Sequence, residues 1–228
     1  MTVAEMHISF KLGYDKVDSQ SYPNFLPQEI DFFLNKGQEQ FIATRLGPNN
    51  LLRKGFEENQ RRIDDLRTLV ISETLSSTKL SDKQFSIDLP DNYRHAKRAK
   101  FKYRSKTCGE GTSETEQYVQ HDDLDFYLSD PFYGPFIDQP IYTFEGNQIL
   151  VYTDGTFTIP ECVLTYIKNP LHLSISAVGV NDPEGFTNIC ELPDYVHEKV
   201  VEFAISSALE TIESPRTVSY QQEIMRQE

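Results

Sequence analysis

The 228-residue chain contains no tryptophan, only three cysteines and no long apolar run. The cysteines, Cys108, Cys162 and Cys190, are odd in number and lack metal-ligand spacing, which predicts reduced thiols. No stretch approaches the roughly 20 apolar residues that a membrane-spanning helix needs. The first residues lack a basic region followed by an apolar run, so we expect no signal peptide and no membrane partner.

Motifs of catalysis and cofactor binding are also missing. The sequence has no G-x-S-x-G, no Walker phosphate loop and no glycine-rich dinucleotide fingerprint. His197-Glu198 begins the zinc-protease pattern H-E-x-x-H, but Val201 stands at the place of the second histidine. Cys190, just before an expected helix, is the least implausible nucleophile. We therefore predict no catalytic residue, no metal ligand and no cofactor, and a protein that is not an enzyme.

Positive charge is scarce, with 22 Lys and Arg against 35 Asp and Glu and a formal net charge of -13. This balance disfavours general affinity for nucleic acids. The exception is a basic run at 94–106, whose alternation predicts a strand with basic side chains on one face. Such a face suits contact with DNA phosphates or an acidic partner, or protects a solvated edge strand from aggregation. The candidate contacts are Arg98, Lys100, Lys102 and Arg104.

Residues 107–140 form a long irregular stretch, acidic at HDDLD (121–125) and rich in proline and aromatic residues further on. A loop of that size is usually functional or ordered by a partner. One alternative function is a metal-dependent hydrolase that uses the acids of 121–138 around a hard cation. A calcium loop is not expected, because Leu128 is the sixth residue from Asp123, where the motif requires glycine. A solvated acidic loop is the simpler interpretation.

Apolar periodicity predicts helices at both ends of the chain and strands between them. We expect helices at 1–18, 27–46 and 50–70, the last two as an antiparallel hairpin. Alternation and turn pairs predict strands from about 70 to 190, including a meander at 140–160. The predicted fold is α+β, an N-terminal helical hairpin packed with a C-terminal long helix around a β-rich insert. Its parts are 1–70, helical; 71–191, β-rich; and 192–228, a helix and tail that complete the bundle.

The expected C-terminal helix at 193–213 is apolar on two sides, so it is either buried in a bundle or shared with a neighbouring subunit. In a monomer, the aromatic segment 126–136 would expose apolar rings to water and so promote aggregation. Both features favour association with other chains, and a general protein-interaction module is a further alternative function. The predicted interface residues are Phe126, Tyr127, Phe132, Tyr133, Phe136, Val201, Ile205, Leu209, Arg216 and Tyr220.

Two similar phrases, LPDNYRHAK at 89–97 and LPDYVHEK at 192–199, raise the question of a histidine site used twice. In the first, Leu-Pro-Asp follows an expected strand, whereas in the second it opens the C-terminal helix. Proline ends one kind of element and is tolerated in the first turn of the other. We interpret both phrases as one turn-forming device at the two borders of the insert, with no chemistry shared by His95 and His197.

The phrase CELPDYVHEKVVEFA at 190–204, followed by LETIESPR at 209–216, resembles the closing helix of a group of phage virion proteins. These are the head-to-tail connector, or adaptor, ring proteins of podovirus-type and crAss-like tailed phages. LPQEIDFFLNKGQEQFIATRL at 26–46, leading into KGFEENQRRIDDLRTLV, is similar to their opening helices. The strand ending in IDLPDNYRH and the later TYIKNP also fit.

The resemblance implies a structural subunit without catalytic activity. Copies would form a symmetric ring, typically of twelve, at the portal vertex or in the tail barrel below it, after assembly in the host cytoplasm. The implied partners are further copies of the chain, the portal protein and neighbouring connector or tail rings, with phage DNA passing through the lumen. No motif indicates the tier that this chain would occupy.

Overall fold

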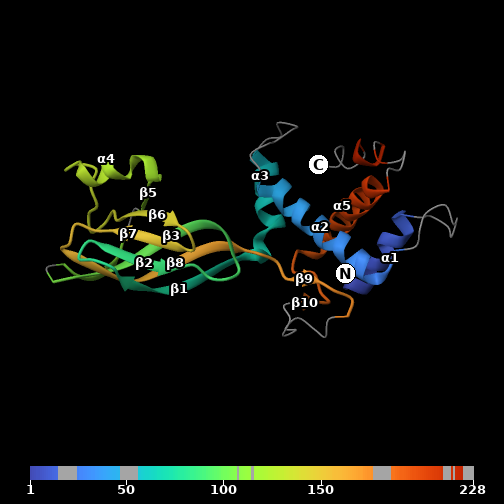
Figure 1. Cartoon of the computed structure of the whole chain (residues 1–228), viewed down its shortest axis with the longest axis horizontal. Coiled ribbons are helices and arrows are strands. Elements are labelled where there is room, and N and C mark those ends of the chain that lie inside the picture. The colour runs from blue at the N-terminus through green and yellow to red at the C-terminus, as the bar shows by residue number, and fades with distance from the viewer. Residues whose placement is uncertain are drawn as a thin grey trace. The chain divides into compact units, whose positions relative to one another are not determined.

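The computed structural model describes most of the chain and divides it into two compact units. The first unit joins Met1–Leu69 to Pro170–Glu228, and the second is Val70–Asn169 (Figure 1). The described residues are 1–14, 25–46, 56–106, 108–113, 116–176, 186–212, 217 and 219–222. Helices dominate the first unit and strands the second, so the predicted α+β fold is confirmed.

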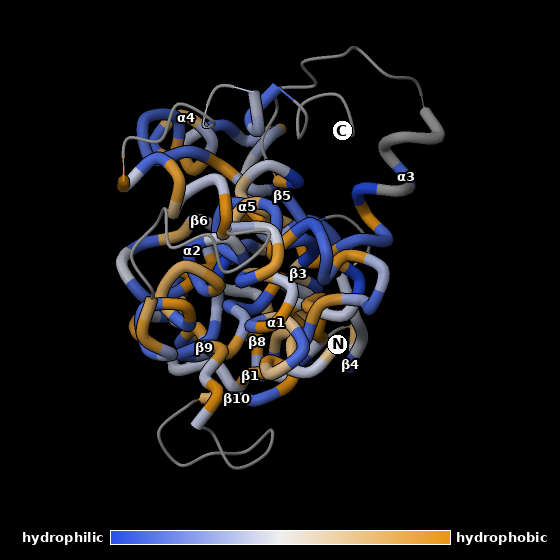
Figure 2. Tube along the Cα trace, turned by 90° about the vertical axis from the view of Figure 1, so that its right-hand side faces the viewer, coloured by the Kyte–Doolittle hydropathy of each residue, from blue (hydrophilic) through white to orange (hydrophobic). Residues whose placement is uncertain are grey.

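The helical unit is built around α5, which packs against both α1 and α2. Apolar residues recur along these helices at intervals of three and four and are fully buried on the packed face. In Figure 2 the hydrophobic residues of the chain alternate with hydrophilic ones instead of forming long runs, and no described helix is long and apolar enough to cross a membrane. The elements of this unit are α1 (Val3–Tyr14), α2 (Pro27–Leu46), α3 (Phe56–Asp65), η1 (Arg67–Leu69), β9 (His172–Leu173), β10 (Phe186–Thr187), η3 (Asp194–Val196) and α5 (His197–Thr211).

Helices α2 and α5 approach each other closely at Gly37. A Cβ atom at this position would lie 2.5 Å from the Val200 carbonyl oxygen and 2.8 Å from the Ala204 amide nitrogen. The absence of a side chain therefore lets the two backbones meet, and the small side chain of Ala204 completes the contact.

A buried carboxylate, Asp31 of α2, joins three segments of the helical unit. It lies 2.7 Å from the His7 Nε2 atom on α1 and accepts hydrogen bonds from the Ser174 hydroxyl and the Ile175 amide, both at 3.2 Å. Nearby, the Asn35 side chain accepts from the Leu173 amide and donates to the Leu173 carbonyl. The segment after residue 170 is thus held on α2 by polar contacts.

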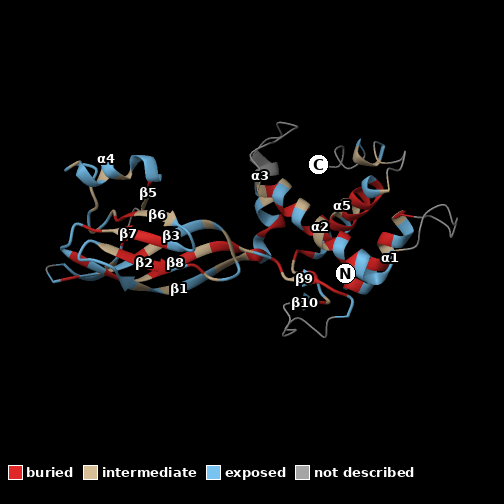
Figure 3. Cartoon of the chain, in the orientation of Figure 1, coloured by how far each residue is buried: buried red, intermediate tan, exposed pale blue. Residues whose placement is uncertain are grey.

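The second unit is an eight-stranded curled sheet in the order β4-β3-β8-β1-β2-β7-β6-β5. All neighbouring strands are antiparallel except β5 and β6. Its inner face carries the core, whose largest fully buried side chains include Tyr166, Phe101 and Phe157 (Figure 3). The elements are β1 (Val70–Lys79), β2 (Gln84–Asp88), β3 (Tyr93–Ser105), β4 (Gly109–Thr112), β5 (Gln117–Tyr118), η2 (His121–Asp123), α4 (Leu124–Ser129), β6 (Ile141–Glu145), β7 (Gln148–Tyr152) and β8 (Phe157–Lys168).

One detail of the predicted strand order is wrong, and two element or unit boundaries differ from those expected. The expected meander at 140–160 ends after the β6–β7 hairpin, because β8 leaves that pair and lies between β1 and β3. The β-rich insert was expected to end at residue 191, whereas the second unit ends at Asn169 and the following segment belongs with α2. The expected helix at 50–70 is described from Phe56 and ends in a short 3-10 turn.

The two Leu-Pro-Asp phrases form the same local turn. The Pro90 carbonyl accepts from the Tyr93 amide at 3.0 Å, and the Pro193 carbonyl accepts from the Val196 amide at 2.9 Å. The first turn leads into β3 and the second into α5. The two phrases therefore form the same kind of turn but precede different elements of secondary structure. The first phrase lies between β2 and β3, inside the second unit and away from its border.

Candidate interaction sites

The acidic stretch 107–140 is partly ordered into short elements. It contributes β4, β5, η2 and α4, and α4 stands outside the sheet in Figure 1. Within the described residues, no three histidine, cysteine or acidic side chains come together as a metal site needs. Asp130 instead accepts the Phe132 amide at 2.7 Å and the Tyr133 amide at 3.3 Å, and His121 lies 2.8 Å from the Phe144 carbonyl. These contacts shape the segment and give no support to the hydrolase alternative.

The aromatic surface, which we define as Phe126, Tyr127, Phe132, Tyr133 and Phe136, lies on α4 and the turns after it. Phe132 is 84% exposed, and Phe126, Tyr133 and Phe136 are 60%, 59% and 47% exposed. Tyr127 is half-buried and makes edge contacts with the rings of Phe126 and Tyr133. A cluster of large exposed rings this close together is typical of a surface that a partner covers.

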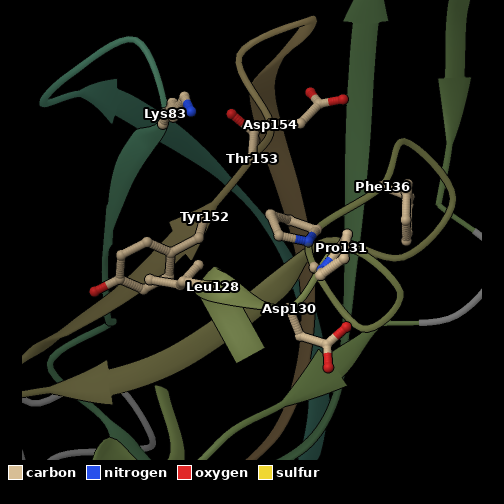
Figure 4. Close-up of a pocket in the computed structure, with 10 residues that line it drawn as sticks. Lys83, Leu128, Asp130, Pro131, Phe136, Tyr152, Thr153 and Asp154 are labelled. Atoms are coloured by element: carbon tan, nitrogen blue, oxygen red, sulfur yellow. The ribbon is translucent and has the colours of Figure 1, made fainter. Parts of the chain in front are cut away.

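A pocket of about 330 Å³ lies beside this surface and shares Phe136 with it (Figure 4). Leu128, Pro131 and Phe136 come from α4 and the turns after it, whereas Lys83 directly precedes β2 and Tyr152 ends β7. Burial raises the pKa of Tyr152, so its hydroxyl keeps its proton at neutral pH. The full lining is Lys83, Leu128, Asp130, Pro131, Gly134, Pro135, Phe136, Tyr152, Thr153 and Asp154.

The basic strand β3 has the predicted alternation, because Ala99 and Phe101 are buried while Lys102 and Arg104 are exposed. Two of its four candidate contacts are already paired within the chain. Lys102 lies 2.7 Å from Glu161 of β8, and Arg104 lies 2.5 Å from Glu110 of β4. Exposed ion pairs of this kind add little stability. They do neutralise two of the four basic side chains on this face of β3.

Arg98 and Lys100 complete the basic face and have no ion pair within the described ranges. β3 is also irregular in this part, with register shifts at 93–95 and 96–98, and β4 pairs only with residues 102–105. Register shifts and lysines at an open edge are common ways of preventing strand addition. The N-terminal half of β3 therefore presents charge and gives a poor template for another strand.

The α5 residues assigned to a subunit interface lie inside the protomer. Val201 and Ile205 are 3% exposed and Leu209 is fully buried. The two-sided helix finds its partners in α1 and α2 of its own chain, which is the bundle alternative. Burial within the chain thus removes the reason for assigning these three residues to contacts with another copy.

The remaining predicted interface residues lie in the tail. Tyr220 is half-buried, and Arg216 lies outside the described residues. Sequence reasoning missed other exposed apolar residues in the helical unit, among them Ile8, Leu12 and Phe32, which are 60% to 64% exposed. These residues could have been found in the sequence, because each is an apolar residue on the otherwise polar side of an amphipathic helix.

Neither Cys190 nor His197 has the surroundings of a catalytic group. Burial raises the pKa of the Cys190 thiol to about 11, and the thiol donates to the Gln38 side-chain oxygen. Burial lowers the pKa of His197, whose Nε2 donates to the Leu192 carbonyl while Nδ1 lies 2.7 Å from the N-terminal amine. Cys162 is also buried, with a pKa raised to about 12, whereas Cys108 is exposed. The reactive thiolate that catalysis needs is disfavoured at both buried cysteines.

Comparison with known protein families places the chain among ring proteins of phage tails. A protein-family model described as phage tail ring protein 3/4 matches residues 1–218. The matched region contains the whole second unit, with the exposed aromatic surface and the pocket, and most of the first unit. No curated protein matches the chain.

Proposed function

Because this chain belongs to the crAss-like family of phage tail ring proteins 3/4, we propose that it builds a closed homo-oligomeric ring at the portal vertex or in the tail barrel below it. The family match over nearly the whole chain carries the proposal and agrees with the resemblance seen in the sequence. Copies of one chain arranged head to tail close into a ring when the rotation between neighbours allows it. Twelve copies per ring, and contacts with the portal protein, are parts of this proposal.

The surface of the second unit supports a role in assembly. The aromatic surface exposes Phe126, Phe132 and Tyr133, which are the residue types that anchor protein interfaces. Exposed to water on a monomer, such a patch promotes unspecific association. We assign it to the contact with an adjacent subunit or an adjacent ring.

The charge of the chain suits a channel through which DNA passes. A net charge of -13 repels phosphates, so DNA would move past an acidic lining without being held. We propose that the basic face of β3 contacts an acidic protein neighbour, since Glu161 and Glu110 neutralise half of it. Its remaining free charges are Arg98 and Lys100.

The role proposed is structural and not catalytic. The family is one of ring proteins, and the acids of 121–138 do not converge within the described residues. If a hydrolase were present, Asp123→Ala and Asp125→Ala would abolish a measurable activity. We expect these two variants to leave particle assembly and infectivity unchanged.

The test of the proposal is the state of association of the full chain. Mass photometry and negative-stain microscopy should show a closed, symmetric particle, alone or after mixing with the portal protein. A protein that remains a monomer under all these conditions and does not bind the portal would refute the ring.

The basic face has its own test within the same assay. Replacing Arg98 and Lys100 by Glu should weaken assembly, whereas the charge swap Lys102→Glu with Glu161→Lys should not, because the swap keeps the pair. An unchanged yield of infectious particles with Arg98→Glu and Lys100→Glu would show that this face contacts nothing.

A further inference from the structure

The first half of β1 lies at an open border of the sheet. Residues 70–76 pair with β8 on one side, whereas β1 pairs with β2 on its other side only over residues 77–79. Within the described part of the chain, no strand pairs with residues 70–76 on that second side. We call residues 70–76 the β1 edge, and in Figure 1 β1 runs along the lower margin of the second unit.

The backbone groups of alternate residues at the β1 edge point away from β8. Along a strand, the N–H and C=O groups of successive residues point to opposite sides. The Leu80 amide donates to the Gln84 carbonyl, on the side of β2. Since no register shift interrupts β1, Ser72 and Thr74 direct their backbone groups to the same side, where the described residues offer them no hydrogen-bond partner. These groups form a template for one more strand.

The two faces of the β1 edge differ in chemistry. Ile71 and Leu75 pack against the core of the sheet but are only half-buried. The alternate residues, on the opposite face, carry exposed hydroxyls; they are Ser72, Thr74 and Ser76. An added strand with apolar residues on the core face and polar residues on the other would cover Ile71 and Leu75 and leave the hydroxyls in water.

Glu73 determines which added strand the edge accepts. It lies opposite Leu164 of β8, which is fully buried, so its side chain is on the core face although the residue is exposed. Burial and the nearby Glu73 charge raise the pKa of Tyr166 to about 12, as expected for a carboxylate on that face. An inward-facing charge on an edge strand hinders unspecific strand pairing. The edge therefore disfavours a purely apolar segment and favours one that brings a cation to Glu73.

A second copy of the chain is a poor source of such a strand. Among the described strands at the borders of the sheet, β4 and β5 are short and the open part of β3 is irregular. Two β1 edges paired antiparallel in the register of greatest overlap would place their Glu73 side chains opposite each other, which is unfavourable. The net charge of -13 likewise favours a basic partner over a second copy.

We propose that the β1 edge binds an extended segment of a different tail protein, which adds as a further strand with a basic residue opposite Glu73 and apolar residues opposite Ile71 and Leu75. Strand addition takes its affinity from main-chain hydrogen bonds and its specificity from alternate side chains. The inference goes beyond the proposed ring, because a single copy carries the whole edge.

Hydrogen exchange measures whether the edge is open in the chain and covered in the particle. In the purified full chain, the amides of Ser72 and Thr74 should exchange rapidly, whereas those of Ile71 and Glu73, which face β8, should be protected. In phage particles, exchange at Ser72 and Thr74 should slow by at least about tenfold. Protection already present in the purified chain, or rapid exchange that persists in particles, would overturn the inference.

A photo-crosslinker identifies the occupant. We would introduce p-benzoylphenylalanine at Thr74, and at Thr158, an exposed threonine of β8, as the control. In phage particles, position 74 should crosslink to another tail protein, at a segment in which apolar and polar residues alternate around a Lys or Arg, and position 158 should not crosslink to that segment. A crosslink from position 74 to a second copy, or no crosslink, would show that the proposed occupant is wrong.

Thr74→Pro removes the amide that an added strand needs, and it costs no hydrogen bond to β8. The melting temperature of the dilute protein should change little, and the yield of infectious particles should fall by at least about tenfold. Thr74→Val keeps the amide and should give a normal yield. If Thr74→Pro lowers the melting temperature, Glu73→Lys is the variant to use, with the same loss expected. Normal yields from a stably folded variant of either kind would contradict the proposal. Both variants should leave the ring formed by the purified chain intact, so the ring and the edge can fail separately.

Discussion

The Arg45 guanidinium donates through Nε to Asp65 Oδ2 over 2.9 Å, and both side chains are buried within the helical unit. The pair joins α2 to α3. Arg45 also lies over the Phe41 ring at 4.7 Å. One carboxylate thus connects α3 to α2, and burial together with the Asp65 charge raises the pKa of Tyr195, in the turn that precedes α5.

Removing one member of this pair should be costly. Asp65→Ala leaves the Arg45 charge buried without its carboxylate, so we expect a loss of about 3–5 kcal/mol in the free energy of unfolding. Urea denaturation followed by circular dichroism measures it. The double variant Arg45→Met with Asp65→Leu should recover most of the loss, since a well-packed apolar pair replaces a buried ion pair at little cost. A double variant as unstable as Asp65→Ala would contradict this account.

Gly37 should not tolerate a methyl group, although alanine is the better helix former by about 1 kcal/mol. Gly37→Ala pushes a Cβ against the α5 backbone, and overpacking of this kind costs about 1–3 kcal/mol. Gly13→Ala is the matched control, because its Cβ meets only the flexible end of the Ile205 side chain. Thermal unfolding should show a clear loss for Gly37→Ala and little change for Gly13→Ala. Equal effects would mean that the helices do not meet at Gly37.

Stability should fall on acidification because of His197. Burial lowers its pKa in the folded chain, so below about pH 6.5 the unfolded chain binds a proton that the folded one does not. Stability is therefore fully present above that pH and is lost as the pH falls toward the lowered pKa. His197→Gln should flatten this dependence between pH 7 and 5 when unfolding midpoints are compared.

The aromatic surface should affect assembly and not folding. Phe132→Ser and Tyr133→Ser remove rings that are mostly exposed, so the melting temperature of the dilute protein should change little. The concentration of half-assembly should rise at least tenfold if these rings are interface anchors. Leu80→Ser, an exposed apolar residue outside the surface, is the control. Normal assembly of the Phe132→Ser variant, measured by mass photometry, would disprove the assignment.

Local pattern predicted the elements better than their partners. The spacing of apolar residues in α2 and α5, and the alternation in β3, identify both the elements and their buried faces. The same spacing does not say whether α5 meets its own chain or another, so the sequence alone could not show that Val201, Ile205 and Leu209 are buried within the protomer. Whether a two-sided helix is covered from within depends on α1 and α2, which are distant in sequence.

Long-range pairing was beyond the reach of the sequence. β8 leaves its sequence neighbour β7 to lie between β1 and β3, and no turn residue encodes that choice. The pair Lys102–Glu161 depends on this crossing. The pocket likewise combines residue 83, residues 128–136 and residues 152–154, which come from three segments. Of the residues that line the pocket, only those of the aromatic segment could be recognised from the sequence.

The interruption of the helical unit by Val70–Asn169 also sets an order of events during synthesis. The sheet is complete once Asn169 has left the ribosome, and its entry and exit strands are neighbours through the Val70–Ile167 pair. Helices α1 and α2 are made first but have no α5 to pack against until the end of translation. The sheet in the middle of the chain can therefore fold before the N-terminal helices do. Until α5 is made, the apolar faces of α1 and α2 have no partner to cover them in the nascent chain.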